Sequence, residues 1–232
     1  MKLLTIAPGV FQVSLGIVNA FIIDDGELTL IDTGTHRNHR DIKRAVEQTG
    51  HKITDLKHII LTHCHADHTG TAAILRQVSG ATVYAHTLDA PLIEKGEKSR
   101  KDKPLHPAPG IFNFMMWNLV LRVIPMPTAP VGVDVLVKDG DTINNKLKVI
   151  HTPGHSAGHI CLLYQANNGI MFAADICCNL GKISYSIVYE DIIDGKRSIT
   201  TIRDMEYETI CFGHGNPILS GADKAMKAAF YK

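Results

Sequence analysis

The stretch Thr62-His63-Cys64-His65-Ala66-Asp67-His68-Thr69-Gly70 places four potential metal ligands within six residues, directly after an apolar run that predicts a strand. Imidazole and carboxylate groups suit zinc, iron or manganese, and four ligands in one loop exceed what a single structural zinc takes from one segment. His63 and His65 are two residues apart, so in an extended chain their side chains point to the same side and can bind one metal. Asp67 and His68 follow at a predicted helix start and are expected to serve a second metal.

Three further candidate ligands lie downstream, next to predicted strands or tight turns. His155 follows Pro153-Gly154, Asp175 ends an apolar strand, and His214 is framed by two glycines that let the backbone approach a metal closely. Ligands on several segments favour a catalytic two-metal site over a closed structural one. The predicted ligand set is His63, His65, Asp67, His68, His155, Asp175 and His214.

Composition limits the kinds of partner. With 232 residues the chain can form one substantial domain, and its 45% hydrophobic and 20% charged residues are ordinary for a globular protein. A formal charge of +1 gives no electrostatic reason to expect a nucleic acid or an anionic membrane. No apolar run reaches membrane-spanning length. We therefore expect a small-molecule substrate, no nucleic acid and no membrane.

The cysteines indicate a reducing environment. Their number is odd, two of them are adjacent at 177–178, and no N-terminal signal segment is visible, because Pro8-Gly9 interrupts the first apolar stretch. We expect five free thiols and a cytoplasmic location.

The pattern of apolar residues predicts two halves, each running from strands to a helix. Asp24-Asp25-Gly26 and Asn167-Asn168-Gly169 are hairpin signals in the first and second half. Such an order suggests two β-sheets packed together, with helices outside. The expected strands are 10–15, 18–23, 27–31, 57–61, 133–137, 147–150, 161–164, 170–173 and 209–212, and the expected helices are 39–48, 72–78 and 191–203.

An insert at about 95–132 separates the halves. It holds six of the ten prolines, which bracket the apolar segment 111–124. We interpret this segment as a lid that forms the substrate pocket, with a core helix or a dimer contact as alternatives. A lid predicts that removing 105–125 lowers turnover and leaves metal content intact. The basic run 95–103 reads as a solvated surface loop or as a contact to an anionic substrate tail.

These motifs resemble the metallo-β-lactamase superfamily. The resemblance rests on 63–68, on the three downstream ligands, on Asp32-Thr33-Gly34 and on Thr-Pro-Gly-His-Ser-Ala-Gly-His at 152–159, and it covers nearly the whole chain outside the insert. It implies a single domain over 1–232 of class α+β, an αββα sandwich of two mixed β-sheets packed face to face with helices outside. It also implies His63, His65 and His155 on one metal, Asp67, His68 and His214 on the other, and Asp175 bridging them.

The resemblance and the ligands together predict a two-metal-dependent hydrolase. A water shared by two metals becomes a bridging hydroxide near neutral pH and can attack a carboxylic thioester, ester or lactone. Asp67 can accept a hydrogen bond from this nucleophile and steer it, while Asp32 is expected to orient a ligand histidine. Side chains alternate in direction along an extended chain, so Cys64 is expected to point away from the metals. The expected cofactor is two divalent metal ions, most simply Zn²⁺, with Fe or Mn as alternatives.

Several residues of this chain differ from those typical of known branches of the superfamily, and these differences limit the expected activity. The commonest β-lactamases resemble a pattern with Arg and Cys where this chain has His68 and Asp175. The glyoxalase II branch is similar in both histidine motifs but carries a helical C-terminal domain that we do not expect here, and lactonases place a tyrosine at the position of Cys178. We predict a glyoxalase II-like or lactonase-like hydrolase, with a possible homodimer. The alternatives are a mononuclear-iron persulfide dioxygenase-like oxidoreductase, and a phosphodiesterase or nuclease of the same superfamily.

Overall fold

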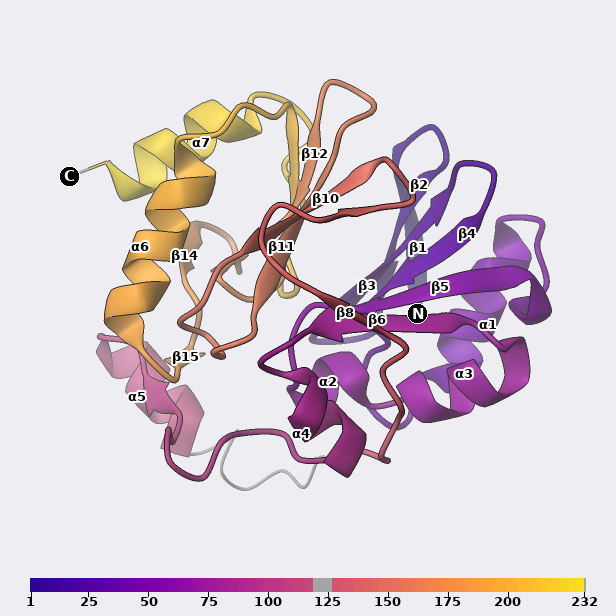
Figure 1. The fold of residues 1–232 in the computed structure, drawn as a ribbon. Helices are drawn as coiled ribbons and strands as arrows, with labels where there is room; N and C mark the ends of the chain where they lie inside the picture. Colours follow the sequence, from indigo (N-terminus) through magenta and orange to yellow (C-terminus); the bar gives the residue numbers. More distant parts are fainter. Residues whose placement is uncertain (119–126, 232) are drawn as a thin grey trace. The chain divides into compact units, whose positions relative to one another are not determined.

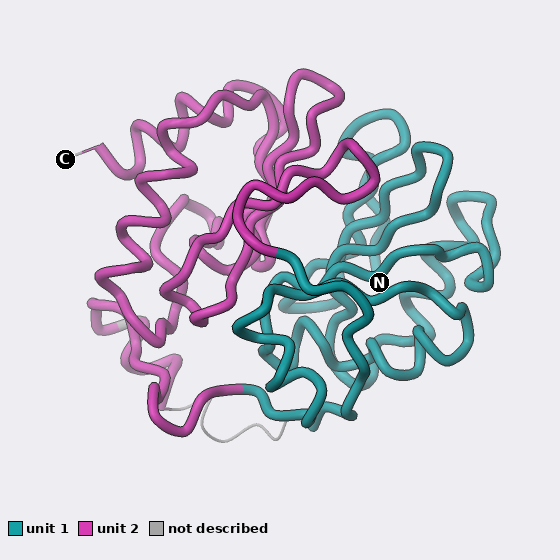
Figure 2. Tube along the Cα trace, in the orientation of Figure 1, with its two compact units in different colours: residues 1–98, 126–137 teal, residues 99–125, 138–232 magenta. Residues whose placement is uncertain are grey.

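The computed structural model describes residues 1–118 and 127–231. It divides into two compact units, Met1–Lys98 with Met126–Val137 and Ser99–Pro125 with Lys138–Lys232 (Figure 2). We call them unit 1 and unit 2. Each unit is built on one main β-sheet, and Figure 1 labels most of the strands.

Unit 1 contains a seven-stranded mixed sheet in the order β1-β2-β3-β4-β5-β6-β8. Its strands are antiparallel from β1 to β4 and parallel from β4 to β8. The strands are β1 Lys2–Ala7, β2 Val10–Ser14, β3 Asn19–Asp24, β4 Leu28–Ile31, β5 Leu56–Leu61, β6 Thr82–His86 and β8 Val135–Val137. The helices are α1 His39–Gln48, the 3-10 helix η1 Ile53–Asp55, α2 Ala66–Thr69, α3 Ala72–Ser79 and α4 Ala90–Lys95.

Apolar periodicity explains how this sheet is covered. In β3, the consecutive residues Phe21, Ile22 and Ile23 are all buried, as expected for a strand covered on both faces. Ile42 and Val46 of α1 lie one helical turn apart and pack into the same core cluster as Ile22. Strand β5, which lies inside the sheet between β4 and β6, ends at Leu61, so a buried and rigid element leads directly into the 62–70 motif.

Unit 2 contains a five-stranded mixed sheet in the order β16-β12-β11-β10-β9, in which only β12 and β16 are parallel. Helices α6 and α7 contact each other, and both contribute to a core cluster with strand residues of this sheet (Figure 1). The strands of the sheet are β9 Thr142–Ile143, β10 Leu147–His151, β11 Ile160–Tyr164, β12 Ile170–Phe172 and β16 Thr209–Cys211. Two small ribbons pair β13 Cys177–Asn179 with β14 Ile183–Tyr185 and β7 His106–Pro107 with β15 Val188–Tyr189, and the helices are α5 Ile111–Met116, α6 Ile192–Arg203 and α7 Ala222–Phe230.

Two glycines allow α6 to approach the turn that precedes His155. A Cβ atom on Gly154, whose φ is +133°, would lie 2.2 Å from the backbone nitrogen of Gly195 in α6. A Cβ atom on Gly195 would lie 2.5 Å from the ring of Tyr189. Both distances are far below van der Waals contact, so glycine at 154 lets the turn meet the α6 backbone, and glycine at 195 leaves room for the Tyr189 ring.

The insert does not contain a buried helix where it can be described. Ile111, Phe114 and Met115 of α5 are 75%, 58% and 51% exposed, so the core-helix alternative is wrong for this part of the segment. The rest of the predicted apolar segment, from 119 onward, lies outside the described residues. Among the residues that are described, no helix is both long and apolar enough to cross a membrane.

The first turn of α6 supplies a stability prediction. The Asp191 carboxylate accepts hydrogen bonds from the backbone N–H groups of Ile193 and Asp194, at 2.8 and 3.1 Å. Asp191→Ala is expected to lower the free energy of unfolding by about 0.5–2 kcal/mol because this cap is lost. Asp191→Asn keeps a capping oxygen and should cost much less. Denaturant unfolding of both variants measures the difference, and equal losses would contradict the capping role.

Candidate metal site

The first ligand cluster lies in unit 1, between the end of β5 and the start of α2. The ring centroid of His63 lies 4.6 Å from that of His65 and 4.2 Å from that of His68. Asp67 Oδ2 lies 3.9 Å from His68 Nε2. The predicted helix start is present, since α2 begins at Ala66 directly after His65. The four candidate ligands of this loop are therefore neighbours in the folded chain.

Asp32 determines which nitrogen of His68 carries the proton. Its Oδ2 lies 2.8 Å from His68 Nδ1, and both side chains are buried. A carboxylate accepts, so Nδ1 donates and Nε2 of the neutral ring carries the lone pair that a metal requires. The same carboxylate accepts from the Thr62 amide at 2.9 Å and from the Thr62 hydroxyl at 2.8 Å. The predicted contact of Asp32 with a candidate ligand histidine is confirmed.

Thr62 extends this arrangement to His63. Because the Thr62 hydroxyl donates to Asp32, its oxygen is left to accept a hydrogen bond from His63 Nδ1, 3.0 Å away. His63 is then also protonated on Nδ1 and presents Nε2. One buried carboxylate thus sets the tautomer of two histidines, one directly and one through a hydroxyl.

Asp89 is a residue that sequence reasoning missed. It lies at the N-terminus of α4, is fully buried, and accepts a hydrogen bond from the Cys64 amide at 3.1 Å. It therefore holds the backbone between His63 and His65. Its local signal is an aspartate before a short helix, which predicts a helix cap and gives no hint of a partner 25 residues earlier.

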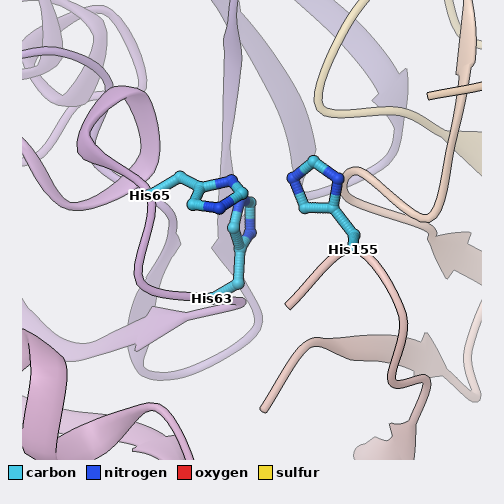
Figure 3. A group of neighbouring side chains, drawn as sticks. All are labelled: His63, His65 and His155. Atoms are coloured by element: carbon cyan, nitrogen blue, oxygen red, sulfur yellow. The ribbon is translucent and has the colours of Figure 1, made fainter. Parts of the chain in front are cut away.

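The second ligand cluster lies in unit 2, on three segments. Asp175 Oδ2 lies 2.9 Å from His214 Nε2 and 3.6 Å from His155 Nε2. His155 Nδ1 donates to the backbone carbonyl of Val188 at 2.8 Å, which leaves the lone pair on Nε2. Figure 3 shows His63 and His65 on the loop after β5 and His155 on the turn after β10. One carboxylate oxygen of Asp175 therefore lies close to the Nε2 atoms of both His155 and His214.

His159 positions Asp175 from within the core. Its Nε2 accepts a hydrogen bond from the Asp175 amide at 3.1 Å, so Nδ1 is protonated and donates to the Thr152 hydroxyl at 2.8 Å. Both ring nitrogens have protein partners. These contacts give His159 a structural role beside Asp175.

Three other histidines outside the predicted ligand set also have contacts with the protein. His58 lies 3.0 Å from the Tyr84 hydroxyl and 2.9 Å from a Glu27 oxygen, while His151 bonds the Ala157 carbonyl at 2.9 Å. His86 accepts from the Leu88 amide at 3.3 Å.

The cysteines offer no ready nucleophile. All five, each within the described part of the chain, are free and buried, and Cys64 belongs to the hydrophobic core of unit 1, as alternation predicted. Burial raises the pKa of Cys161 to about 12, although a hydrogen bond with Thr152 opposes the rise. Burial also raises the pKa of the Cys177 and Cys211 thiols. A protonated thiol is a poor nucleophile, so chemistry at these sites is disfavoured.

Each unit therefore carries a cluster of His and Asp side chains whose chemistry fits a metal. Three histidines have Nδ1 held as a donor and Nε2 as the lone-pair nitrogen, and carboxylates accompany them in both clusters. Neutral imidazole fixed in this way by a partner on its other nitrogen is typical of metal-binding histidines.

Comparison with known proteins identifies the family. Residues 13–214 match the model described as "Metallo-beta-lactamase superfamily". The chain belongs to the metallo-β-lactamase superfamily. Its fold class is the predicted one, an α+β sandwich of two mixed sheets with helices.

Individual known proteins are similar to this chain in sequence or in structure. The chain is 32% identical to the uncharacterized protein YobT of Bacillus subtilis, over 97% of this chain and 92% of YobT. It is 24% identical to the probable metallo-hydrolase YqjP of the same organism, over 89% and 70%, and 26% identical to the acyl-coenzyme A thioesterase MBLAC2 of Gallus gallus, over 73% and 60%. The structure of BJP-1, a subclass B3 metallo-β-lactamase of Bradyrhizobium japonicum, matches with a TM-score of 0.73 at 20% identity, over 98% and 89%. At this identity the last likeness shows the fold alone.

Proposed function

We propose that this superfamily member is a metal-dependent hydrolase of carboxylic thioesters, esters or lactones. The observation that carries the proposal is the set of fixed tautomers: His63, His68 and His155 each have Nδ1 engaged as a donor, which presents Nε2 as a ligand. A histidine whose other ring nitrogen donates to a carboxylate, a hydroxyl or a backbone carbonyl has the form that metal-binding histidines usually take.

We further propose how the ligands are shared. His63, His65 and His155 would hold one metal, Asp67, His68 and His214 the other, and Asp175 would bridge them. Membership of the superfamily supports this division. Asp175 Oδ2 lies near the Nε2 atoms of both His155 and His214, which suits a carboxylate that serves two ions.

In the proposed reaction the metal and the protein side chains have different roles. A bound divalent metal lowers the pKa of a water molecule and polarises the scissile carbonyl. Asp67 would orient the attacking water and accept its proton, because its carboxylate lies beside His68 at the edge of the ligand loop. Asp32 and Asp89 would keep the 62–68 loop rigid through their hydrogen bonds to it. The buried thiols argue for attack by water rather than by a protein nucleophile.

The proposed substrate class follows from one relative and from helix α5. The acyl-coenzyme A thioesterase among the relatives favours a thioester, and the exposed apolar side chains of α5 suit an acyl group. His68 and Asp175 replace the Arg and Cys typical of the commonest β-lactamases, so antibiotic hydrolysis is not the activity we propose.

Metal analysis combined with a substrate panel tests the proposal. The purified protein should contain about two metal ions per chain and hydrolyse members of a thioester and lactone panel. Chelation should abolish the activity, and added Zn²⁺, Fe²⁺ or Mn²⁺ should restore it. A protein with less than about one metal per chain would contradict the proposal. Oxygen consumption with glutathione persulfide, without hydrolysis, would support the dioxygenase alternative instead.

A further inference from the structure

One short segment of unit 2 holds both the ring and the backbone of His155. The Val188 carbonyl accepts from His155 Nδ1 at 2.8 Å, and the Glu190 amide donates to the His155 carbonyl at 3.3 Å. Between them, the Tyr189 ring stands edge-on to the imidazole, at 6.0 Å between centroids. The geometry of His155 therefore depends on 188–190 as much as on its own turn.

The Glu190 side chain fastens the other end of the same turn. Its Oε2 accepts a hydrogen bond from the Ala157 amide at 2.7 Å, and the side chain is only 2% exposed. A hydrogen bond to a carboxylate is stronger than one between neutral groups. Glu190 thus binds the turn on both sides of Ser156, through its amide at His155 and through its carboxylate at Ala157.

The insert is attached to this same segment. Strand β7 pairs with β15, and the Ala108 amide donates to the Ile187 carbonyl at 2.8 Å. Arg100 Nε lies 4.0 Å from Glu190 Oε2, and the Arg100 side chain is only 14% exposed. A buried carboxylate requires a compensating charge, and the arginine of the insert supplies one. Arg100 is therefore not part of a freely solvated loop.

We propose that Glu190 is a positioning residue for His155 and that Arg100 of the insert keeps Glu190 in place. The proposal rests on the proposed function, in which His155 is a metal ligand. It changes what the insert does, because residues 100–108 form part of the support of the metal site rather than only a cover for substrate. Removing 105–125 would delete β7 and should weaken metal binding as well as turnover, in contrast to the expectation for a simple lid.

Zinc affinity tests the proposal without reference to activity. Zinc binding to the metal-free protein is measured by competition with a chromophoric chelator for the wild type, Glu190→Ala, Glu190→Gln, Arg100→Gln and the double variant with Arg100→Gln and Glu190→Gln. Glu190→Ala should weaken the affinity about 10- to 100-fold, as loss of a group that orients a ligand usually does. Glu190→Gln should lose less, because its amide oxygen can still accept from Ala157. Arg100→Gln should weaken binding in the wild-type background and add little once Glu190→Gln has removed the charge.

The exposed neighbour Lys101 provides a matched control, since Lys101→Gln removes a positive charge from the same run and should leave the affinity unchanged. Circular dichroism of the metal-free proteins checks that each variant is folded. If Glu190→Ala is unfolded, the cycle of Arg100→Gln and Glu190→Gln decides: additive effects contradict the proposal, and non-additive effects support it. Unchanged affinity in folded Glu190→Ala overturns this inference alone, whereas a wild type that binds no zinc overturns the proposed function.

Discussion

Asp67→Ala is expected to lower kcat for hydrolysis of the best thioester or lactone about 10²- to 10⁴-fold. The carboxylate lies in the first turn of α2, with Oδ2 3.9 Å from His68 Nε2, and in the proposed mechanism it orients the attacking water and takes its proton. An alanine at this position can do neither, and it also removes a proposed ligand. Steady-state kinetics with parallel metal analysis measures both losses.

Asp67→Asn separates the two roles. The amide keeps the size of the side chain and one oxygen that can bind a metal, but it does not accept a proton. We expect kcat to fall with KM and metal content much less affected. Hydrolysis that is unchanged in Asp67→Ala would remove Asp67 from the mechanism and contradict the proposed function.

Asp32→Asn should disable the site through the tautomers of its histidines. If the amide oxygen continues to accept from the Thr62 amide, its NH₂ group faces His68 Nδ1 and the Thr62 hydroxyl, where two acceptors are now needed. His68 then favours the form protonated on Nε2, which cannot bind a metal through that nitrogen. We expect a 10- to 100-fold loss of metal affinity or more, and a loss of about 1–3 kcal/mol in the free energy of unfolding.

The backbone conformation at position 32 allows Asp32→Asn to test the side chain alone. Asp32 has a φ of +60°, a conformation that asparagine also tolerates, so Asp32→Asn adds little backbone strain. Asp139→Asn is the control, because the exposed Asp139 accepts a single bond from the His151 amide that asparagine can also accept. Chelator competition and denaturant unfolding on both variants make the comparison. A variant Asp32→Asn that binds metal like wild type would show that Asp32 is not needed to set these tautomers.

Sequence patterns predicted the elements whose signals are local. The helix 39–48 has the predicted bounds, and Asn167-Asn168-Gly169 connects two antiparallel strands as expected, with positive φ at all three positions. The strands β7 and β15 were missed because two residues have no periodicity and become a strand only through pairing. Helix α7 and strand β1 were also not predicted.

The residues of the candidate site also fall into those that local sequence patterns predict and those that they do not. The ligands were visible because histidines and aspartates stand at strand ends, and Asp32 was visible because it ends a strand in the same manner. Asp89 and Glu190 were not, because each bonds a backbone amide 25 or 33 residues away, and the sequence around them gives no sign of that contact.

The close approach of Gly154 and Gly195 limits how this protein can be redesigned. Replacing a glycine within a helix by alanine is a common way to stabilise a protein, worth about 1 kcal/mol from helix propensity alone. In α6 the same change would push against Tyr189, whose ring stands beside His155. A library that optimises α6 for thermostability should therefore keep position 195 fixed, because a more stable helix there would come at the expense of the geometry around His155.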